Sequence, residues 1–255
     1  MTKQLPLFLA VLVIICCGGF VQAQSEKPPY YLLMREDARQ LLDSLQCQPQ
    51  ESNAFMRLVL LHNLSFSDKD KQARENAENI FENYFKKDTT AIIQAYGHSL
   101  KLLNVRDRNT AGNTWRLTKT FFGLFGDDPY EEANKAFRNL QAELHRDANN
   151  IQLRILSLSA AIETAEHLDG NLGYAYRDLK WLQDNFDRLD STETFFYTLS
   201  WVKYAYKYSI IKEIPDEAQK GYIWLEYAEH FALSEVYCQE IYFWRMKLDS
   251  VEVKK

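Results

Sequence analysis

Two pentapeptides carry residue types that could bind a metal ion. Glu163 to His167 reads ETAEH, and Glu226 to His230 reads EYAEH, 63 positions later. In each, a glutamate and a histidine four residues apart would share one face of a helix. Carboxylate and imidazole groups are common zinc ligands, so each pentapeptide could hold part of a metal site.

The residues around the pentapeptides favour a repeated packing unit over a metal site. Apolar, small or aromatic residues recur at the same offset of 63: Ile151, Ile155, Leu158, Ile162 and Ala165 correspond to Ile214, Ala218, Gly221, Leu225 and Ala228, Tyr174 to Tyr237, and Trp181 to Trp244. A metal site requires only its ligands, whereas a repeat also requires an apolar seam for helix packing. We therefore predict no metal ligand and no cofactor, and interpret the similarity as a repeated helical hairpin.

A second candidate for chemistry is Gly97 to Lys101, GHSLK, which partly matches the nucleophile elbow G-x-S-x-G. The elbow needs glycine on both sides of the serine, because its strained strand-to-helix turn leaves no room for side chains. Lys101 occupies the second glycine position, and the flanking sequence has a helical pattern. We expect Gly97 to allow close approach of a neighbouring helix instead, and we predict no catalytic residue and no enzyme.

Aromatic residues make up 14% of the chain and are densest in its last third. Helical repeats bury most such residues between their layers. Tyr and Trp in excess of the core can also form a binding surface, because they combine apolar area with a polar tip. Trp201, Tyr204 and Tyr208 have the spacing of one helix face. The candidate binding residues all lie in FFYTLSWVKYAYKY: Tyr197, Trp201, Tyr204, Tyr206 and Tyr208.

The elements that would position these residues are helices. Only six prolines and nine glycines occur in the chain, and most fall between segments with helical periodicity. Short connections imply that successive helices are antiparallel neighbours. We predict an all-α fold of about eleven helices, at 30–46, 51–64, 68–86, 89–103, 110–124, 129–145, 149–167, 172–187, 191–211, 216–231 and 233–248.

Two helix junctions share a pattern, FKKDTTAIIQAY from Phe85 and LHRDANNIQLRI from Leu144. A small residue, Ala77 or Ala136, stands eleven positions before the aspartate of each junction. This arrangement resembles the tetratricopeptide repeat, which implies helical hairpins stacked as an α-solenoid with a concave binding face. Thr89 and Ala148 stand where that repeat has proline. The 59 positions between the two aspartates exceed the ~34 of the standard unit, and an extra helix near 110–124 would account for the excess.

The chain is also similar to exported, uncharacterised bacterial helical-repeat proteins. The shared residues are Ala95-Tyr96-Gly97, Ser99-Leu100, Arg106-Asp107, and Asp147, Asn149 and Arg154. This resemblance implies a fold and an exported location, and it implies no activity.

The N-terminus has the pattern of a signal peptide over 1–23. Lys3 is its only charge, an apolar run follows, and Val21 and Ala23 suit cleavage before Gln24. The run is shorter than the ~20 apolar residues of a membrane-spanning helix. We expect a linker at 24–29, a helical domain at 30–255, and a periplasmic or secreted protein. Lipidation at Cys17 is the alternative, and it would tether the protein to a membrane.

The charge of −5 argues against nucleic acid or an anionic membrane as the main partner. Beyond the signal peptide, Cys47 and Cys238 remain, and we expect two buried free thiols, with a disulfide between them as the alternative. The apolar run LTKTFFGLFGDDP at 117–129 is expected to be a helix end packed on its neighbour, with insertion at a membrane surface as the alternative.

The sequence thus predicts an exported, non-catalytic scaffold that binds a protein or peptide on the concave face of a helical-repeat array. The alternatives are a carbohydrate-binding or hydrolytic protein with an aromatic groove, and a lipid-anchored structural component of the cell envelope. We predict that Tyr197, Trp201, Tyr204 and Tyr208 form the binding surface.

Overall fold

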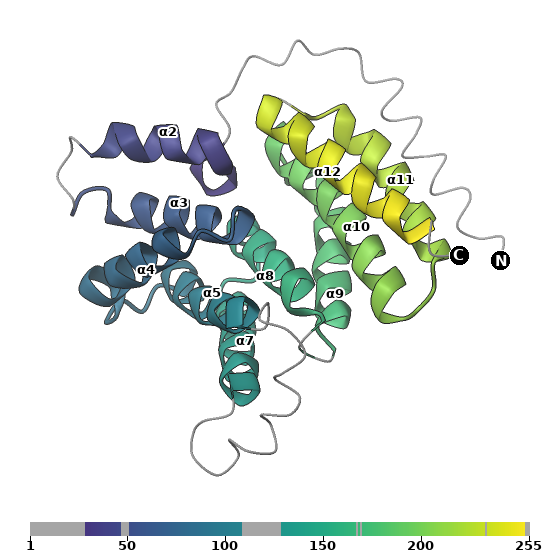
Figure 1. Cartoon of the computed structure of the whole chain (residues 1–255). Coiled ribbons are helices and arrows are strands. Elements are labelled where there is room, and N and C mark those ends of the chain that lie inside the picture. Colours follow the sequence, from purple (N-terminus) through teal and green to yellow (C-terminus); the bar gives the residue numbers. More distant parts are fainter. Residues whose placement is uncertain are drawn as a thin grey trace.

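Helices dominate the computed structural model, which describes residues 29–46, 51–108, 129–166, 168, 170–232 and 234–252 (Figure 1). Within these ranges the chain forms ten α-helices and no strand, so the all-α prediction is confirmed. The α-helices are α2 (Arg35–Leu45), α3 (Ala54–Ser67), α4 (Lys71–Ile80), α5 (Ala91–Arg108), α7 (Pro129–Arg146), α8 (Ile151–Thr164), α9 (Asn171–Asp184), α10 (Ser191–Ile211), α11 (Asp216–Glu229) and α12 (Glu235–Glu252). Three short helical turns accompany them: η1 (Tyr30–Leu32), η2 (Phe81–Phe85) and η4 (Phe186–Arg188).

Local signals account for several helix starts. Asp70 and Asn150 cap α4 and α8 by accepting hydrogen bonds from the backbone N–H three residues later. Asp190 and Glu193 form a reciprocal capping box at the start of α10. Pro129 opens α7 as predicted, and α11 begins at Asp216, directly after a proline. The predicted helix 110–124 and the apolar segment 117–129 lie outside the described residues, apart from Pro129 itself.

The prediction of one helix over 30–46 is wrong in its first part, because tertiary contacts hold residues 30–34 in another conformation. Leu33 and Met34 are extended, and α2 begins only at Arg35. The Asn63 side chain of α3 donates hydrogen bonds to the carbonyls of Tyr31 and Leu33, at 3.1 and 2.9 Å. These bonds satisfy backbone groups that a continuous helix would have paired internally.

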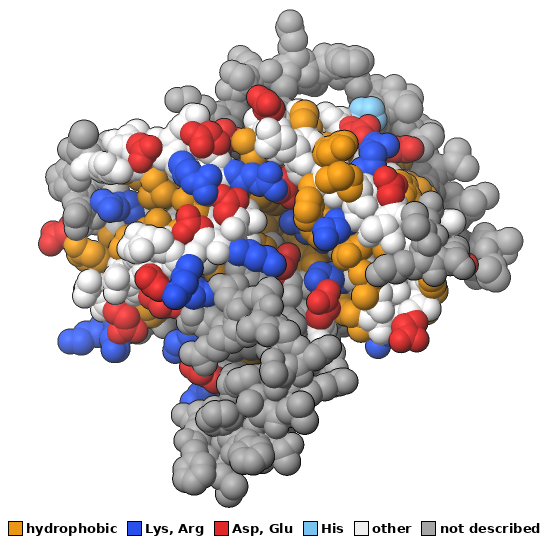
Figure 2. Space-filling view, viewed as in Figure 1, with side chains coloured by type: hydrophobic (Ala, Val, Ile, Leu, Met, Phe, Trp, Pro, Cys, Tyr) orange, Lys and Arg blue, Asp and Glu red, His pale blue; other side chains and the backbone are white. Residues whose placement is uncertain are grey.

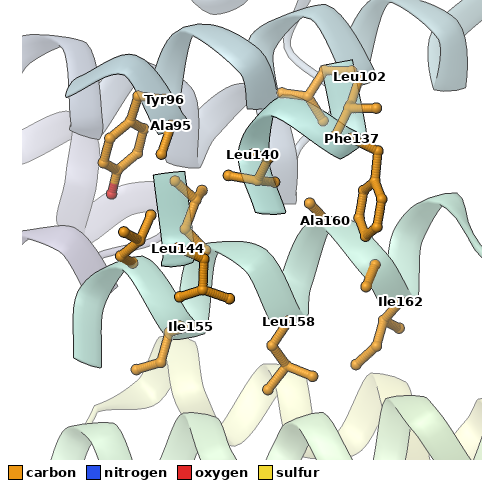
Figure 3. Packing of buried hydrophobic residues seen from close by; sticks show 14 of the residues in the cluster. Ala95, Tyr96, Leu102, Phe137, Leu140, Leu144, Ile155, Leu158, Ala160 and Ile162 are labelled. Carbon is orange, nitrogen blue, oxygen red and sulfur yellow. The ribbon is translucent and has the colours of Figure 1, made fainter. Parts of the chain in front are cut away.

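Helices that follow each other in the chain pack in pairs: α3 on α4, α5 on α7, α8 on α9, and α10 on α11. The first members of these pairs also contact one another in series, from α3 through α5 and α8 to α10, and α10 contacts α12. Figure 3 shows side chains of α7, among them Leu140 and Leu144, lying between those of α5 and α8. The small residues predicted at packing positions, Ala77 and Ala136, are buried.

The first described elements meet the last ones. Helix α2 contacts α12, and Arg35 pairs with Glu240, 205 positions away. Met34 belongs to the same buried cluster as Phe195 and Tyr237. The first and the last described helices therefore lie beside each other, and the described helices follow a curved path between them (Figure 1).

Gly97 permits the close packing expected from the sequence. A Cβ atom at this position would overlap the ring of Phe81. We expect Gly97→Ala to lower the free energy of unfolding by about 1–3 kcal/mol, because the ring has to shift in a packed region. Urea unfolding followed by circular dichroism measures the change.

Gly173 provides a matched control for this prediction, because a Cβ there meets nothing within 4 Å and the residue lies in α9. Gly173→Ala should raise the free energy of unfolding by about 0.5–1 kcal/mol, as a helical alanine replaces glycine. If Gly97→Ala also stabilised the protein, the close approach of Phe81 would not constrain this position.

Candidate functional site

A cavity of about 410 Å³ lies where the two ends of the array meet. Its walls come from η1, the start of α2, and the helices α3, α5, α8, α10 and α12. Among the described residues that line it, none comes from α4, α7, α9 or α11. Among the described helices from α3 onward, every second helix therefore lines the cavity, and the helices between them do not.

The wall formed by α3, α5 and α8 combines apolar side chains, such as those of Ile155 and Leu156, with polar ones. The hydroxyl of Tyr96 accepts a hydrogen bond of 3.1 Å from Nε2 of Gln152. Burial raises the pKa of Tyr96, so its hydroxyl stays neutral at any ordinary pH. His62 Nε2 and Ser99 Oγ form a hydrogen bond of 2.8 Å. Besides the carboxylate of Glu163, this wall offers neutral hydrogen-bonding groups beside apolar side chains.

The wall formed by α10 and α12 is aromatic. Phe243 and Trp244 meet edge to face with their ring centroids 5.4 Å apart, and Tyr206 contacts Trp244 at 5.6 Å. Phe196 lines the cavity beside them. Aromatic side chains present large, rigid contact area at low cost in conformational entropy.

Basic side chains outnumber acidic ones around the cavity. Arg35, Lys69, Lys203, Lys207 and Lys247 line it, against the three acids Glu163, Glu166 and Glu240. Figure 2 shows Lys and Arg side chains among acidic ones across the middle of the face in view.

Two of the five cations pair with an acidic side chain, and the other three have no acidic partner among the described residues. Arg35 pairs with Glu240, and Lys207 pairs with Glu166 at 2.6 Å. Lys69, Lys203 and Lys247 form no ion pair with any residue that the structure describes.

Two of the lining cations lie in strained backbone. Arg35 has φ of 47° and Lys69 has φ of 54°, in the left-handed region that non-glycine residues rarely occupy. This conformation costs roughly 1–2 kcal/mol per residue. Glu213 is the other described non-glycine residue with positive φ, and it is not among the residues that line the cavity. Strain of this kind is typical of ligand clamps and active sites.

The four binding residues predicted from the sequence lie on another side of α10. Trp201 stacks on Trp224 of α11 at 5.3 Å, and Trp201, Tyr204 and Tyr208 form a row of touching rings, which confirms that they share a face. Tyr197 is only 2% exposed and contacts Trp224. None of the four lines the cavity, whereas Tyr206 does. Burial raises the pKa of Tyr197 and of Tyr204 to about 12, so both are neutral hydroxyls.

The lysines of the cavity were not predicted from the sequence as binding residues, although the spacing of two of them indicates a shared helix face. Lys203 and Lys207 are four residues apart within α10, the spacing of a shared helix face. That face could have been recognised as a basic stripe between aromatic positions. The other two lysines that line the cavity, Lys69 and Lys247, come from other parts of the fold and have no such signal.

The two pentapeptides do not form equivalent sites. Glu163 lines the cavity, whereas Glu226 and His230 are exposed at the end of α11, and His167 lies outside the described residues. Among the described residues, no group of three or more His, Cys, Asp or Glu is placed to hold a metal ion.

The sequence similarity at an offset of 63 relates helices that lie differently with respect to the cavity. It matches α8 and α9 to α11 and α12, and buried positions such as Leu158 and Ile162 correspond to buried Gly221 and Leu225. However, α8 lines the cavity and α11 contributes no residue to it among those described. The repeated pattern therefore reflects helix-to-helix packing, not a common position relative to the cavity.

The prediction that Cys238 is buried is wrong. Cys238 is exposed on α12, because the buried face of this helix is formed by neighbours such as Tyr237 and Ile241. Cys17, Cys47 and the region 1–28 lie outside the described residues. None of the described helices has the length and apolar character needed to cross a membrane.

Comparison of the chain with protein-family models, with curated proteins and with solved structures gives no match. The cavity and its residues are therefore the basis for assigning a function.

Proposed function

We propose that this chain is a tetratricopeptide-like helical array that binds a segment of another protein, or a peptide, in the cavity between α3, α8, α10 and α12. The paired packing of successive helices supports the array, as does the alternation of lining and outer helices. Stacked helical pairs of this kind present side chains from several repeats to one concave surface.

The cavity itself is the observation that carries the proposal. Its volume of about 410 Å³ falls within the ~300–1,000 Å³ of sites that bury a small ligand or a few side chains. A wall of rigid aromatic rings faces a wall with neutral hydrogen-bonding groups such as Tyr96 and Gln152. This combination suits a mixed apolar and polar ligand such as a short peptide segment.

We further propose that the protein is exported and non-catalytic. The pattern of a signal peptide over 1–23 supports export. A binding role requires only the cavity and its side chains, without a reacting group.

Selection from a random twelve-residue peptide display library tests the proposal. We expect recovered peptides to bind the purified protein and to bind Ser159→Trp at least ten-fold more weakly. Ser159 lines the cavity from α8, so an indole there would fill space that a peptide needs.

The matched control is Lys220→Trp, because Lys220 is exposed on α11 with 65% of its side chain accessible. This variant should bind as the unmodified protein does. Equal binding of the peptides to Ser159→Trp would contradict the proposal. If binding were lost in Tyr204→Ala instead, the binding surface would be the aromatic row on α10.

A further inference from the structure

We infer that the peptide segment bound in this cavity is acidic, and that Lys203 and Lys247 receive its carboxylates. The inference rests on the proposed function and adds the charge of the ligand. It follows from three features of the cavity: its balance of charge, the surroundings of its lysines and the charge of the rest of the molecule.

The balance of charge in the cavity runs against that of the chain. The whole protein has a net charge of −5, yet the cavity is lined by five basic and three acidic residues. Within the described chain Lys203 and Lys247 have no acidic partner. Basic groups collected in a concave site raise the local concentration of anions and steer them inward.

The surroundings of Lys203 and Lys247 strengthen their attraction for an anion. The ammonium of Lys203 lies 5.5 Å from the ring centroid of Trp244, and that of Lys247 lies 5.4 Å from the centroid of Phe243. These rings contact each other, so both ammonium groups border one aromatic surface. Cation–π contact orients an ammonium while leaving its N–H donors available. Apolar surroundings also make a charge-assisted hydrogen bond stronger than it is in water.

Carboxylates carried on a peptide fit this site better than a nucleic acid does. A nucleic acid would bring a long series of phosphates toward a protein of net negative charge, and the resulting repulsion would oppose binding outside the cavity. A peptide brings only a few charges and can place apolar side chains against Phe196 and Tyr206.

Replacing Glu163 should change the affinity for an acidic peptide in the opposite direction to replacing a lysine. Glu163 lines the same cavity, so its carboxylate repels an acidic ligand. Glu163→Gln should therefore tighten the binding of an acidic peptide, whereas loss of a lysine should weaken it. A change in fold stability or in cavity shape alone would not produce this pattern of opposite effects.

The experiment uses peptides recovered from the random library, each synthesised also with every Asp and Glu replaced by Asn and Gln. We expect Asp and Glu to be enriched in the recovered peptides, and the amide versions to bind at least ten-fold more weakly. Lys203→Gln and Lys247→Gln should each weaken the acidic peptide about ten-fold and the amide version hardly at all. Glu163→Gln should strengthen the acidic peptide a few-fold, and Lys220→Gln, outside the cavity, should change neither.

Two further arms identify the source of the carboxylate and exclude another anion. Peptides with a free and an amidated C-terminus separate side-chain carboxylates from the terminal one, and the inference expects side-chain carboxylates to account for most of the difference. A dye-labelled single-stranded oligonucleotide should bind more weakly than the acidic peptide. If the oligonucleotide bound more tightly and was sensitive to Lys203→Gln, the assignment of a peptide would be overturned.

The outcomes separate the inference from the proposed function. If acidic and amide peptides bind equally and both are lost in Ser159→Trp, the cavity binds peptides but the inference about charge is wrong. If no peptide is recovered, or Ser159→Trp leaves binding unchanged, the proposed function fails and the inference fails with it.

Discussion

Replacing Asp178 by alanine is expected to lower the free energy of unfolding by about 3–5 kcal/mol, because it leaves the buried guanidinium of Arg154 without its counter-charge. Asp178 is 0% exposed and Arg154 is 7% exposed. They form an ion pair of 2.8 Å between α9 and α8. The loss should appear as a lower midpoint in urea unfolding followed by circular dichroism.

The surrounding network explains why this pair is so sensitive. Ser157 donates a hydrogen bond of 2.7 Å to the second carboxylate oxygen of Asp178, and Gln141 of α7 donates one of 2.7 Å to Ser157. Arg154 also donates to the carbonyl of Ala148 and lies 4.6 Å from the ring centroid of Trp181. Burial raises the pKa of Asp178, and hydrogen bonds from Ser157 and Arg154 act in the opposite direction. The network thus connects α7, α8 and α9 through one carboxylate.

Two comparisons test this account of Asp178. Removing both charges in Arg154→Met/Asp178→Leu should restore most of the lost stability, because no buried charge remains unpaired. Glu217→Ala breaks an exposed pair with Lys220 and should change the free energy of unfolding by no more than about 0.5 kcal/mol. A loss below 1 kcal/mol for Asp178→Ala would mean that the network does not hold these helices together.

Replacing Phe195 by alanine should cost about 3–5 kcal/mol, since the side chain is fully buried and its removal leaves a cavity. Its ring stacks on Tyr237 of α12 with centroids 4.5 Å apart and planes 14° apart. The same cluster contains Met34, which packs the N-terminal segment against α10 and α12. Urea unfolding of the variant measures the loss.

Besides lowering the overall stability, Phe195→Ala should loosen the N-terminal segment that packs in the same cluster. Hydrogen exchange of the backbone from Tyr31 to Met34 should become faster in Phe195→Ala, because the segment loses part of its packing surface. Tyr242→Ala is the control, as Tyr242 is 64% exposed on the same helix as Tyr237. That variant should keep both its stability and its exchange rates. Unchanged exchange in Phe195→Ala would show that the N-terminal segment is held by other contacts, such as those of Asn63.

The helices could be predicted from the sequence because their determinants are local. The capping box of Asp190 and Glu193 spans three residues, and the side chains of one helix face recur every three or four. The shared face of Trp201, Tyr204 and Tyr208 and the close approach at Gly97 follow from the same short-range geometry. The prediction that Cys238 is buried was wrong. The periodicity of α12 identifies an apolar face, but it does not show how far neighbouring helices cover that face.

The cavity could not be predicted from local sequence patterns, because it is formed by residues that are far apart in the chain. Arg35 and Glu240 are 205 positions apart, and they meet only because the series of helix pairs curves back on itself. Whether the aromatic or the lysine face of α10 turns toward the centre is decided by packing against α9, α11 and α12. The sequence by itself determined the helices, their caps and the periodic faces, since these arise from contacts within about four residues. The tertiary structure decided which faces meet, and it brought the lysines and the aromatic wall of the cavity together.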